Sequence, residues 1–367
     1  MDDFSIKIAK IIRQYGLTGR NYGLMDGNTG ISILFYHLAR NTNNPEFEKV
    51  ADELLDVVFA NLNTLFPVDF ENGLAGIGWG IEYLVQNNFV EGNTDKILEE
   101  VDNKIFRTLI EESHNSIELG NGLTGILFYL INRLKMQKAP LMMANRINRE
   151  LLILTINKID ELVITQIAAI VKEMQFDLFW RFPLLLFGCT EAFRLNIYNY
   201  KINNMIRQWL PYFEAFIPSL QINRLYLSVV LMHIHSLIPE KRLEKQSRIL
   251  LYATDFELLR NEVDHNMINV RFGWPGFLAL LSIAMKELPE DWQNYTLIRQ
   301  TYRLILGQHY GQLEKLSENK PNEKTLTFGL SLGLAGISII ELFWPGILTG
   351  KESKDLSIGE IFSSAVR

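Results

Sequence analysis

Two kinds of segment alternate along this chain, and they differ in where their charged residues fall. Some are almost uncharged, such as ISILFYHL, IGWGIEYL and ILFYLINRL. Others are amphipathic and carry charges at helical spacing, such as residues 46–62 and 93–110. A helix that is apolar on every side is buried, whereas an amphipathic one lies at the surface. The pattern therefore predicts buried helices alternating with surface helices, with no strand among them.

A Gly-x-x-Gly word opens each of the clearest apolar stretches. The five words are Gly27-Asn-Thr-Gly30, Gly73-Leu-Ala-Gly76, Gly122-Leu-Thr-Gly125, Gly273-Trp-Pro-Gly276 and Gly333-Leu-Ala-Gly336. They recur roughly every fifty residues, apart from one gap of about three periods, and such self-similarity is typical of a repeat architecture. We infer two degenerate repeats inside the gap, which makes seven in all.

Pairing each amphipathic segment with the apolar one that follows it divides the chain into seven helical pairs. The expected pairs are 3–16 with 27–40, 46–64 with 73–88, 94–112 with 120–135, 141–172 with 179–198, 200–217 with 221–237, 240–261 with 273–287, and 293–316 with 330–344. Residues 141–172 fit one long helix or two shorter ones. The expectation is an all-α closed array forming a single domain over 1–367.

The paired glycines have an architectural interpretation. We expect the first to take a left-handed turn without a Cβ penalty and the second to let neighbouring backbones approach closely. They form neither a phosphate loop nor a dinucleotide fingerprint, because the flanking strand and lysine are missing. Several helices starting at one end would, however, aim unpaired N–H groups at a common mouth, which would favour an anion or a carboxylate.

Composition and charge narrow the class of protein. The 367 residues are 48% hydrophobic and 21% charged, as in ordered globular proteins. A net charge of −6 without a basic cluster argues against nucleic acid as the main partner. The acidic start of the chain is unlike a signal peptide, and no apolar stretch reaches membrane-spanning length. We expect a cytoplasmic protein with no membrane span.

The words YGLMDGNTGISILFYHLA, NGLAGIGWGIEYL, LGNGLTGILFYLI, FGWPGFLALLSIA and LSLGLAGISIIEL, at this spacing, resemble the lanthionine synthetase C-like family. The resemblance covers nearly the whole chain and is specific as a set. It implies a double-layered α/α toroid of seven inner and seven outer helices. Enzymes of that family cyclise ribosomally made peptides by adding a Cys thiol to a dehydrated Ser or Thr, using a zinc ion that lowers the thiol pKa.

The zinc ligands that the resemblance implies, two cysteines and a histidine, are not matched. Arg271 stands where the Cys of the family's Trp-Cys-x-Gly word would be, and Ser331-Leu332-Gly333 best matches its Cys-His-Gly word. The chain has one Cys, so a Cys₂His site cannot be built within it. We therefore expect no metal and no cofactor. A guanidinium at this position would repel a metal ion and attract carboxylate or phosphate.

Six residues are candidates for contact with a ligand at the mouth. Arg271 is the first, and His265 could reach the mouth beside Asp264 and Arg271. Asp26, Glu71 and Glu118 precede buried helices, where capping or dipole pairing is the simpler role. Trp274 lies at the same end. We expect Arg271 alternatively to pair with Asp264 or Glu262 and merely hold its loop.

Other chemistry-bearing residues favour structural roles. His233 and His235 are two apart on a helix and cannot chelate one metal. Cys189 lies in the apolar word LLLFGCTEAF and is expected to be buried. His37 and Arg40 could face either the interior of the closed helical array or a neighbouring helix.

Two functional hypotheses remain open from the sequence. The first is a zinc-less, catalytically degenerate toroid that binds a peptide or small anionic ligand, with a partner protein from a ribosomal-peptide modification system. The second is a metal-independent glycosidase or lyase, for which Asp26, Glu71 and Glu118 would supply carboxylates. A purely structural interaction protein is a further alternative.

Overall fold

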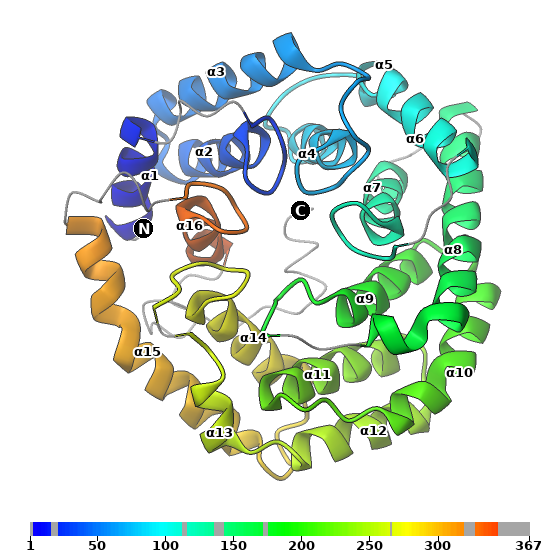
Figure 1. Ribbon diagram of the computed structural model, residues 1–367. Helices are drawn as coiled ribbons and strands as arrows, with labels where there is room; N and C mark the ends of the chain where they lie inside the picture. The colour runs from blue at the N-terminus through cyan, green and yellow to red at the C-terminus, as the bar shows by residue number, and fades with distance from the viewer. Residues whose placement is uncertain are drawn as a thin grey trace. The chain divides into compact units, whose positions relative to one another are not determined.

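The described part of the chain is all-helical. A computed structural model describes residues 3–15, 21–111, 116–135, 143–171, 175–264, 266–318 and 327–343, and within them the only strand-like pairing is an isolated bridge between Asp264 and Gly273. The helices are α1 (Asp3–Tyr15), α2 (Asn28–Thr42), α3 (Pro45–Asn61), α4 (Leu74–Gln86), α5 (Thr94–Ile97), α6 (Glu99–Glu111), α7 (Leu123–Lys135), α8 (Met143–Ile170), α9 (Arg181–Arg194), α10 (Asn199–Ala215), α11 (Gln221–Leu237), α12 (Lys241–Tyr252), α13 (Phe256–Asn261), α14 (Trp274–Glu287), α15 (Tyr295–Glu318) and α16 (Leu334–Phe343) (Figure 1).

Two compact units make up the described chain. The first contains α1, α2, α3, α13, α14, α15 and α16, together with the short segment Gln175–Leu178. The second contains α4 to α12. A single domain over 1–367 stays a prediction.

The predicted alternation of buried and amphipathic helices is confirmed. In α2, every residue from Asn28 to Leu38 is buried, and in α7 every residue from Leu123 to Leu134 is buried. In α3, by contrast, buried residues recur at helical spacing between exposed charges. The mostly buried helices are α2, α4, α7, α9, α11, α14 and α16. The segments that sequence patterning places in the degenerate repeats therefore behave like the others.

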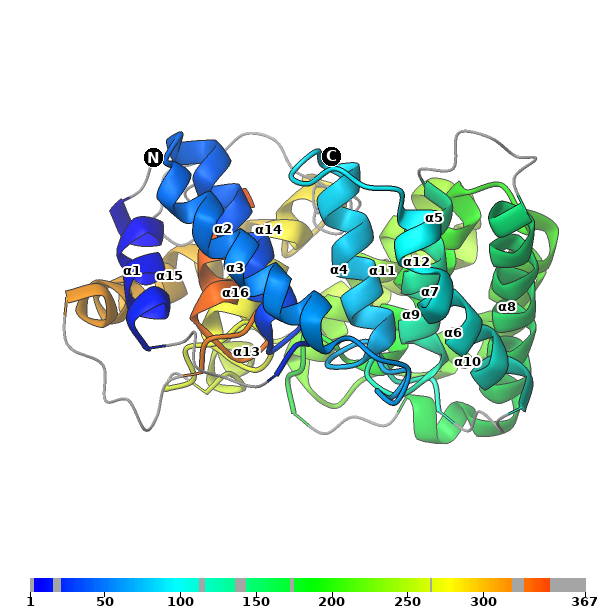
Figure 2. The same ribbon diagram turned by 90° about the horizontal axis from the view of Figure 1, so that it is seen from above.

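The predicted pairing of the helices is wrong by one step. Within the first unit, α2 packs mainly on α3, α14 on α15, and α16 on α1 (Figure 1). Within the second unit, α7 packs on α8 and α11 on α12 (Figure 1). Figure 2 shows the α2–α3 pair of the first unit from another side. In four of these pairs the buried helix packs on the amphipathic helix that follows it, and α16, the last helix described, packs on α1. Short connections explain this, because α2 ends at Thr42 and α3 begins at Pro45, the geometry of an antiparallel helical hairpin.

Two of the amphipathic segments differ in detail from the expectation, and a third fits one of the two alternatives expected for it. Residues 94–112 form two helices, α5 and α6, and residues 240–261 form α12 and α13. The segment 141–172 contains one long helix, α8, with a non-helical backbone at Gln166 (φ −126°, ψ 17°).

Each Gly-x-x-Gly word closes a loop with the same hydrogen bond. The first residue of the helix donates its amide to the carbonyl seven residues earlier, and we call the loops that end in this way glycine loops. The five bonds are Asn28 to Asn21 (2.9 Å), Leu74 to Pro67 (2.9 Å), Leu123 to Ser116 (3.0 Å), Trp274 to Met267 (3.3 Å) and Leu334 to Thr327 (3.1 Å). The repeat seen in the sequence is therefore a repeated backbone conformation.

Steric crowding, not a left-handed backbone, explains the first glycine of each word. Gly273 has φ −99° and ψ 176°, which any residue can adopt, so the expected left-handed turn is wrong here. A Cβ atom on Gly273 would instead overlap the carbonyl oxygen of Met267. At the second position, a Cβ on Gly276 would overlap the carbonyl oxygen of Val270, which confirms the expected close approach.

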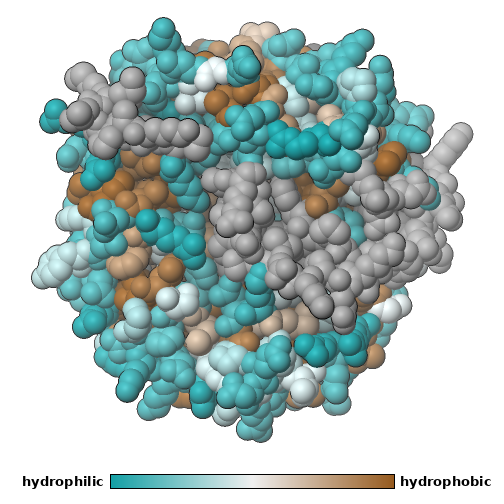
Figure 3. Space-filling view, turned by 180° about the vertical axis from the view of Figure 1, so that it is seen from behind, coloured by the Kyte–Doolittle hydropathy of each residue, from teal (hydrophilic) through white to brown (hydrophobic). Residues whose placement is uncertain are grey.

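No described helix is both long and apolar enough to cross a membrane. The face drawn in Figure 3 is mostly hydrophilic and carries separate hydrophobic patches. Exposed large apolar residues are likewise distributed over several amphipathic helices, for example Phe59 on α3 and Ile249 on α12.

Candidate functional site

Backbone hydrogen bonds join three glycine loops of the first unit to the segment Gln175–Leu178. The amide of Ser331 donates to the carbonyl of Met25 (3.1 Å), and the amide of Arg271 donates to the carbonyl of Ser331 (3.1 Å). The amide of Leu178 in turn donates to the carbonyl of Arg271 (2.8 Å). Met25, Ser331 and Arg271 each stand two residues before the first glycine of their word. The shared loop conformation therefore brings equivalent positions side by side.

Arg271 forms an ion pair with Asp177 at this junction. Its Nε lies 3.1 Å from Oδ1 and 3.2 Å from Oδ2, and its Nη2 lies 3.1 Å from Oδ2. Its guanidinium carbon also lies 5.0 Å from the centre of the Phe272 ring. Both charged side chains are 22% exposed. The structure gives Arg271 the carboxylate of Asp177 as a partner, where the sequence suggested Asp264 or Glu262.

Asp26 adds a second carboxylate to the same unit. Its Oδ1 accepts a hydrogen bond from the amide of Leu332 (3.3 Å). Burial raises the pKa of Asp26, although the amides of Leu332 and Ser331 and the charge of Arg271 act in the opposite direction. Two carboxylates therefore accompany one guanidinium, so the cluster is not the net-positive site that Arg271 alone suggested.

Glu71 and Glu118 belong to the second unit. Glu118 is half exposed and lies 3.3 Å from Nη1 of Arg181, with which it forms an ion pair. Glu71 lies next to the neighbouring glycine loop, because a Cβ on Gly120 would stand 3.3 Å from its Cδ. Asp26 and Arg271 thus form one local cluster, and Glu71 and Glu118 border another loop.

Trp274 does not occupy a ligand-accessible position in the structure. Its side chain is fully buried and stacks on His309, with ring centres 5.2 Å apart and an angle of 18° between the rings. The expectation of ligand contact is corrected accordingly: Trp274 supports the start of α14. His265, the remaining candidate, lies outside the described residues.

The starts of the buried helices offer fewer free amides than expected. In α16, the amides of Leu334, Ala335 and Gly336 donate to the carbonyls of Thr327, Phe328 and Gly329. A glycine loop thus folds back to cap its own helix, which satisfies donors that would otherwise be exposed. The idea that these amides point unpaired at an anion is wrong for α16, where all three have partners.

The structural roles expected for Cys189 and His233 are consistent with their burial. Burial raises the pKa of the Cys189 thiol to about 12, so the thiol stays protonated at neutral pH. The His233 ring packs on Phe187, with ring centres 5.5 Å apart. Burial also lowers the pKa of His37 to about 3, with a smaller effect of Arg40.

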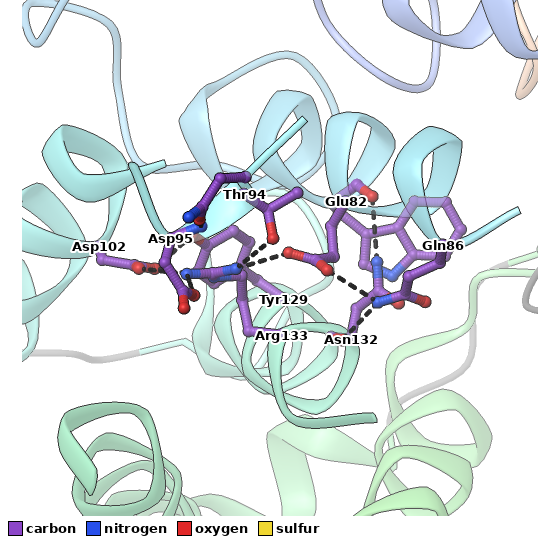
Figure 4. Close-up of polar contacts among 10 residues, drawn as sticks. Glu82, Gln86, Thr94, Asp95, Asp102, Tyr129, Asn132 and Arg133 are labelled. Carbon is purple, nitrogen blue, oxygen red and sulfur yellow. Dashed lines mark hydrogen bonds and ion pairs between the residues drawn. The ribbon is translucent and has the colours of Figure 1, made fainter. Parts of the chain in front are cut away.

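A second charged cluster surrounds Arg133 in the second unit (Figure 4). Arg133 is 1% exposed and lies 2.5 Å from Glu82, 2.8 Å from Asp102 and 3.0 Å from Asp95. Burial alone would lower its pKa, but Tyr129, Asp102 and Glu82 raise it overall. The cluster joins α7 to α4, α5 and α6. All the guanidinium nitrogens donate within it, so its role is to fix these helices together.

The residues that stand where the family resemblance implies zinc ligands do not fit a zinc ion. A guanidinium has no lone pair to donate, and Arg271 already binds Asp177. Ser331, at the second position, is 1% exposed and has a hydroxyl instead of a thiol. Among the described side chains, no group of three or more His, Cys, Asp or Glu is arranged to hold a metal ion.

Comparisons with known proteins support the family resemblance. Residues 19–176 match a family model described as lanthionine synthetase C-like protein, and this match ends before Arg271. The solved structure of nisin cyclase matches with a TM-score of 0.64 over 91% of this chain and 92% of that one, at 14% sequence identity. No curated protein sequence matches the chain. The structural similarity shows the expected fold class, the all-α toroid.

Proposed function

We propose that this chain is a lanthionine synthetase C-like (LanC-like) protein that takes part in ribosomal-peptide modification. It binds a peptide but does not carry out zinc-dependent cyclisation. The family match and the similarity to nisin cyclase support the LanC-like part. The proposal of peptide binding without zinc rests on the ion pair of Arg271 with Asp177. Arg271 stands where the resemblance implies a thiolate ligand of zinc.

The charges of the site favour a peptide over a small free anion. Asp177 already neutralises Arg271, and Asp26 adds a further negative charge. A phosphate or a free carboxylate would meet two like charges beside one guanidinium. A peptide brings both donors and acceptors, so it can satisfy Asp26 as well as Arg271.

A cyclisation and binding assay tests the proposal. A fluorescent precursor-type peptide containing Cys and dehydroalanine is incubated with the protein and zinc. Binding is followed by anisotropy, and free thiol is followed by alkylation and mass spectrometry. We expect binding with unchanged free thiol, and weaker binding by Arg271→Ala. Arg242→Ala, at an exposed ion pair with Glu214, is the matched control.

Two results would contradict the proposal. Thiol loss that depends on protein concentration would show that cyclisation persists. Failure of the wild-type protein to bind this peptide or an unmodified version of it would remove the binding role.

The carbohydrate-active alternative gains no specific support. Glu118 is engaged by Arg181, and Trp274 is too deeply buried to form a sugar platform. Burial raises the pKa of Asp26, which suits a proton donor. A glycosidase, however, needs two carboxylates that flank the bond to be cleaved, and Asp26 alone does not provide such a pair.

A further inference from the structure

The segment Gln175–Leu178 belongs to a different compact unit from the helices that flank it in the sequence. It groups with the first unit, whereas α8 before it and α9 after it belong to the second. Three consecutive residues of the segment contact the first unit, and each uses a different kind of interaction.

The three contacts are a ring contact, an ion pair and a backbone hydrogen bond. Phe176 is 2% exposed, and its ring meets Phe277 edge to face with centres 6.3 Å apart. Asp177 binds the Arg271 guanidinium through both carboxylate oxygens. Leu178 donates its amide to the carbonyl of Arg271 at 2.8 Å.

The same three kinds of contact are used in the recognition of short peptides. Backbone hydrogen bonds orient the peptide, a guanidinium recognises a carboxylate through paired contacts, and a buried aromatic ring supplies apolar area. The segment therefore makes peptide-like contacts at the residue that the proposed function assigns to binding.

The exposure of the contacts differs along the segment. Arg271 and Asp177 are each 22% exposed, so water and a competing carboxylate can reach the ion pair. Phe176 is buried and anchors the segment next to the pair. The ion pair is thus the accessible part of the contact and the aromatic ring is its buried part.

We propose that Gln175–Leu178 is an internal occupant of the peptide site, and that a peptide with an aromatic residue followed by an acidic one takes its place. This inference rests on the proposed function. A tethered occupant has a high effective concentration, so it lowers the apparent affinity for an added peptide by the fraction of molecules in which the site is open. Weakening the internal contact raises that affinity.

Fluorescence anisotropy with short blocked peptides tests the proposal. The probe is labelled Gln-Phe-Asp-Leu with an amidated C-terminus, so that Asp carries its only carboxylate. The matched peptides are Gln-Phe-Asn-Leu and Gln-Ala-Asp-Leu. The proteins are wild type, Asp177→Ala, the double variant Asp177→Ala/Arg271→Ala, and Glu214→Gln as a control that opens an exposed ion pair elsewhere.

We expect Asp177→Ala to bind the probe about tenfold more tightly than wild type or Glu214→Gln, the size of effect for one charge-assisted contact. The gain should disappear in the double variant, and both matched peptides should bind Asp177→Ala more weakly than the probe. Asp177→Asn, which keeps the side-chain size, replaces Asp177→Ala if the latter melts early.

Equal affinity of wild type and the Asp177 variants for the probe would overturn the internal occupant. If both proteins still bind the precursor-type peptide, the proposed function stands and this inference alone fails. If neither protein binds any of the peptides, both fail.

Discussion

Arg271 and Asp177 are 94 residues apart in sequence, yet Nε of the arginine contacts both carboxylate oxygens, at 3.1 and 3.2 Å. The pair joins the glycine loop before α14 to the segment that precedes α9. Because Leu178 also donates to the carbonyl of Arg271, side chain and backbone hold the same junction.

A double-mutant cycle measures the strength of this junction. Arg271→Ala, Asp177→Ala and the double variant are compared with wild type by urea unfolding. We expect a coupling of about 1 kcal/mol, because the pair is bidentate but partly exposed. Strictly additive losses would show that the two side chains do not interact in solution.

The glycine loops predict opposite effects for two Gly→Ala substitutions. Gly276→Ala places a Cβ on the carbonyl oxygen of Val270, and we expect a loss of about 1–3 kcal/mol or more. Gly307→Ala, in α15, meets no atom within 4 Å and should stabilise the helix by about 0.5–1 kcal/mol. Denaturant midpoints measure both, and a harmless Gly276→Ala would refute the steric explanation.

Arg133 is expected to be the most sensitive charged residue in the described chain. Arg133→Met leaves Glu82 and two aspartates without their common cation, so we expect a loss of about 3–5 kcal/mol. Arg242→Met removes an exposed partner of Glu214 and should have no measurable effect on the unfolding midpoint. Similar midpoints for the two variants would contradict a structural role for the Arg133 cluster.

The partly buried carboxyl of Asp26 predicts a pH-dependent stability. Its pKa is raised above the ordinary value of 3.8, so the folded state binds this proton more tightly than the unfolded state does. The stability from this proton is present at low pH and is lost as pH rises through the folded pKa. Asp26→Asn should therefore raise the melting temperature at pH 7, and the difference should shrink toward pH 4.

Melting curves between pH 4 and pH 7 provide the measurement. A lower melting temperature for Asp26→Asn at pH 7 would mean that the carboxylate gains more from Arg271 and the amides than it loses by burial.

The helices were predictable because burial leaves a strong mark on composition. α2 and α7 are buried on all sides, so their sequences lack charge over most of their length. The order of packing was less evident, although the two-residue connection between α2 and α3 was a usable signal. Connection length, rather than the alternation itself, determines which neighbours form a hairpin.

The site was only partly predictable. The family resemblance singled out Arg271, because it stands two residues before a glycine word, where the family's Trp-Cys-x-Gly word has its Cys. Asp177 gave no comparable signal, since an ion pair between distant segments depends on how they fold together. Trp274 was misplaced for a related reason: the sequence puts it at the start of α14, but only packing against His309 shows that its ring is inside.

Zinc stoichiometry tests the central claim most directly. Purified full-length protein is incubated with excess zinc, desalted and measured by elemental analysis. Because Arg271 and Ser331 stand at the implied ligand positions and the chain has one Cys, we predict far less than one zinc ion per chain. Retention of about one zinc ion per chain would contradict the account.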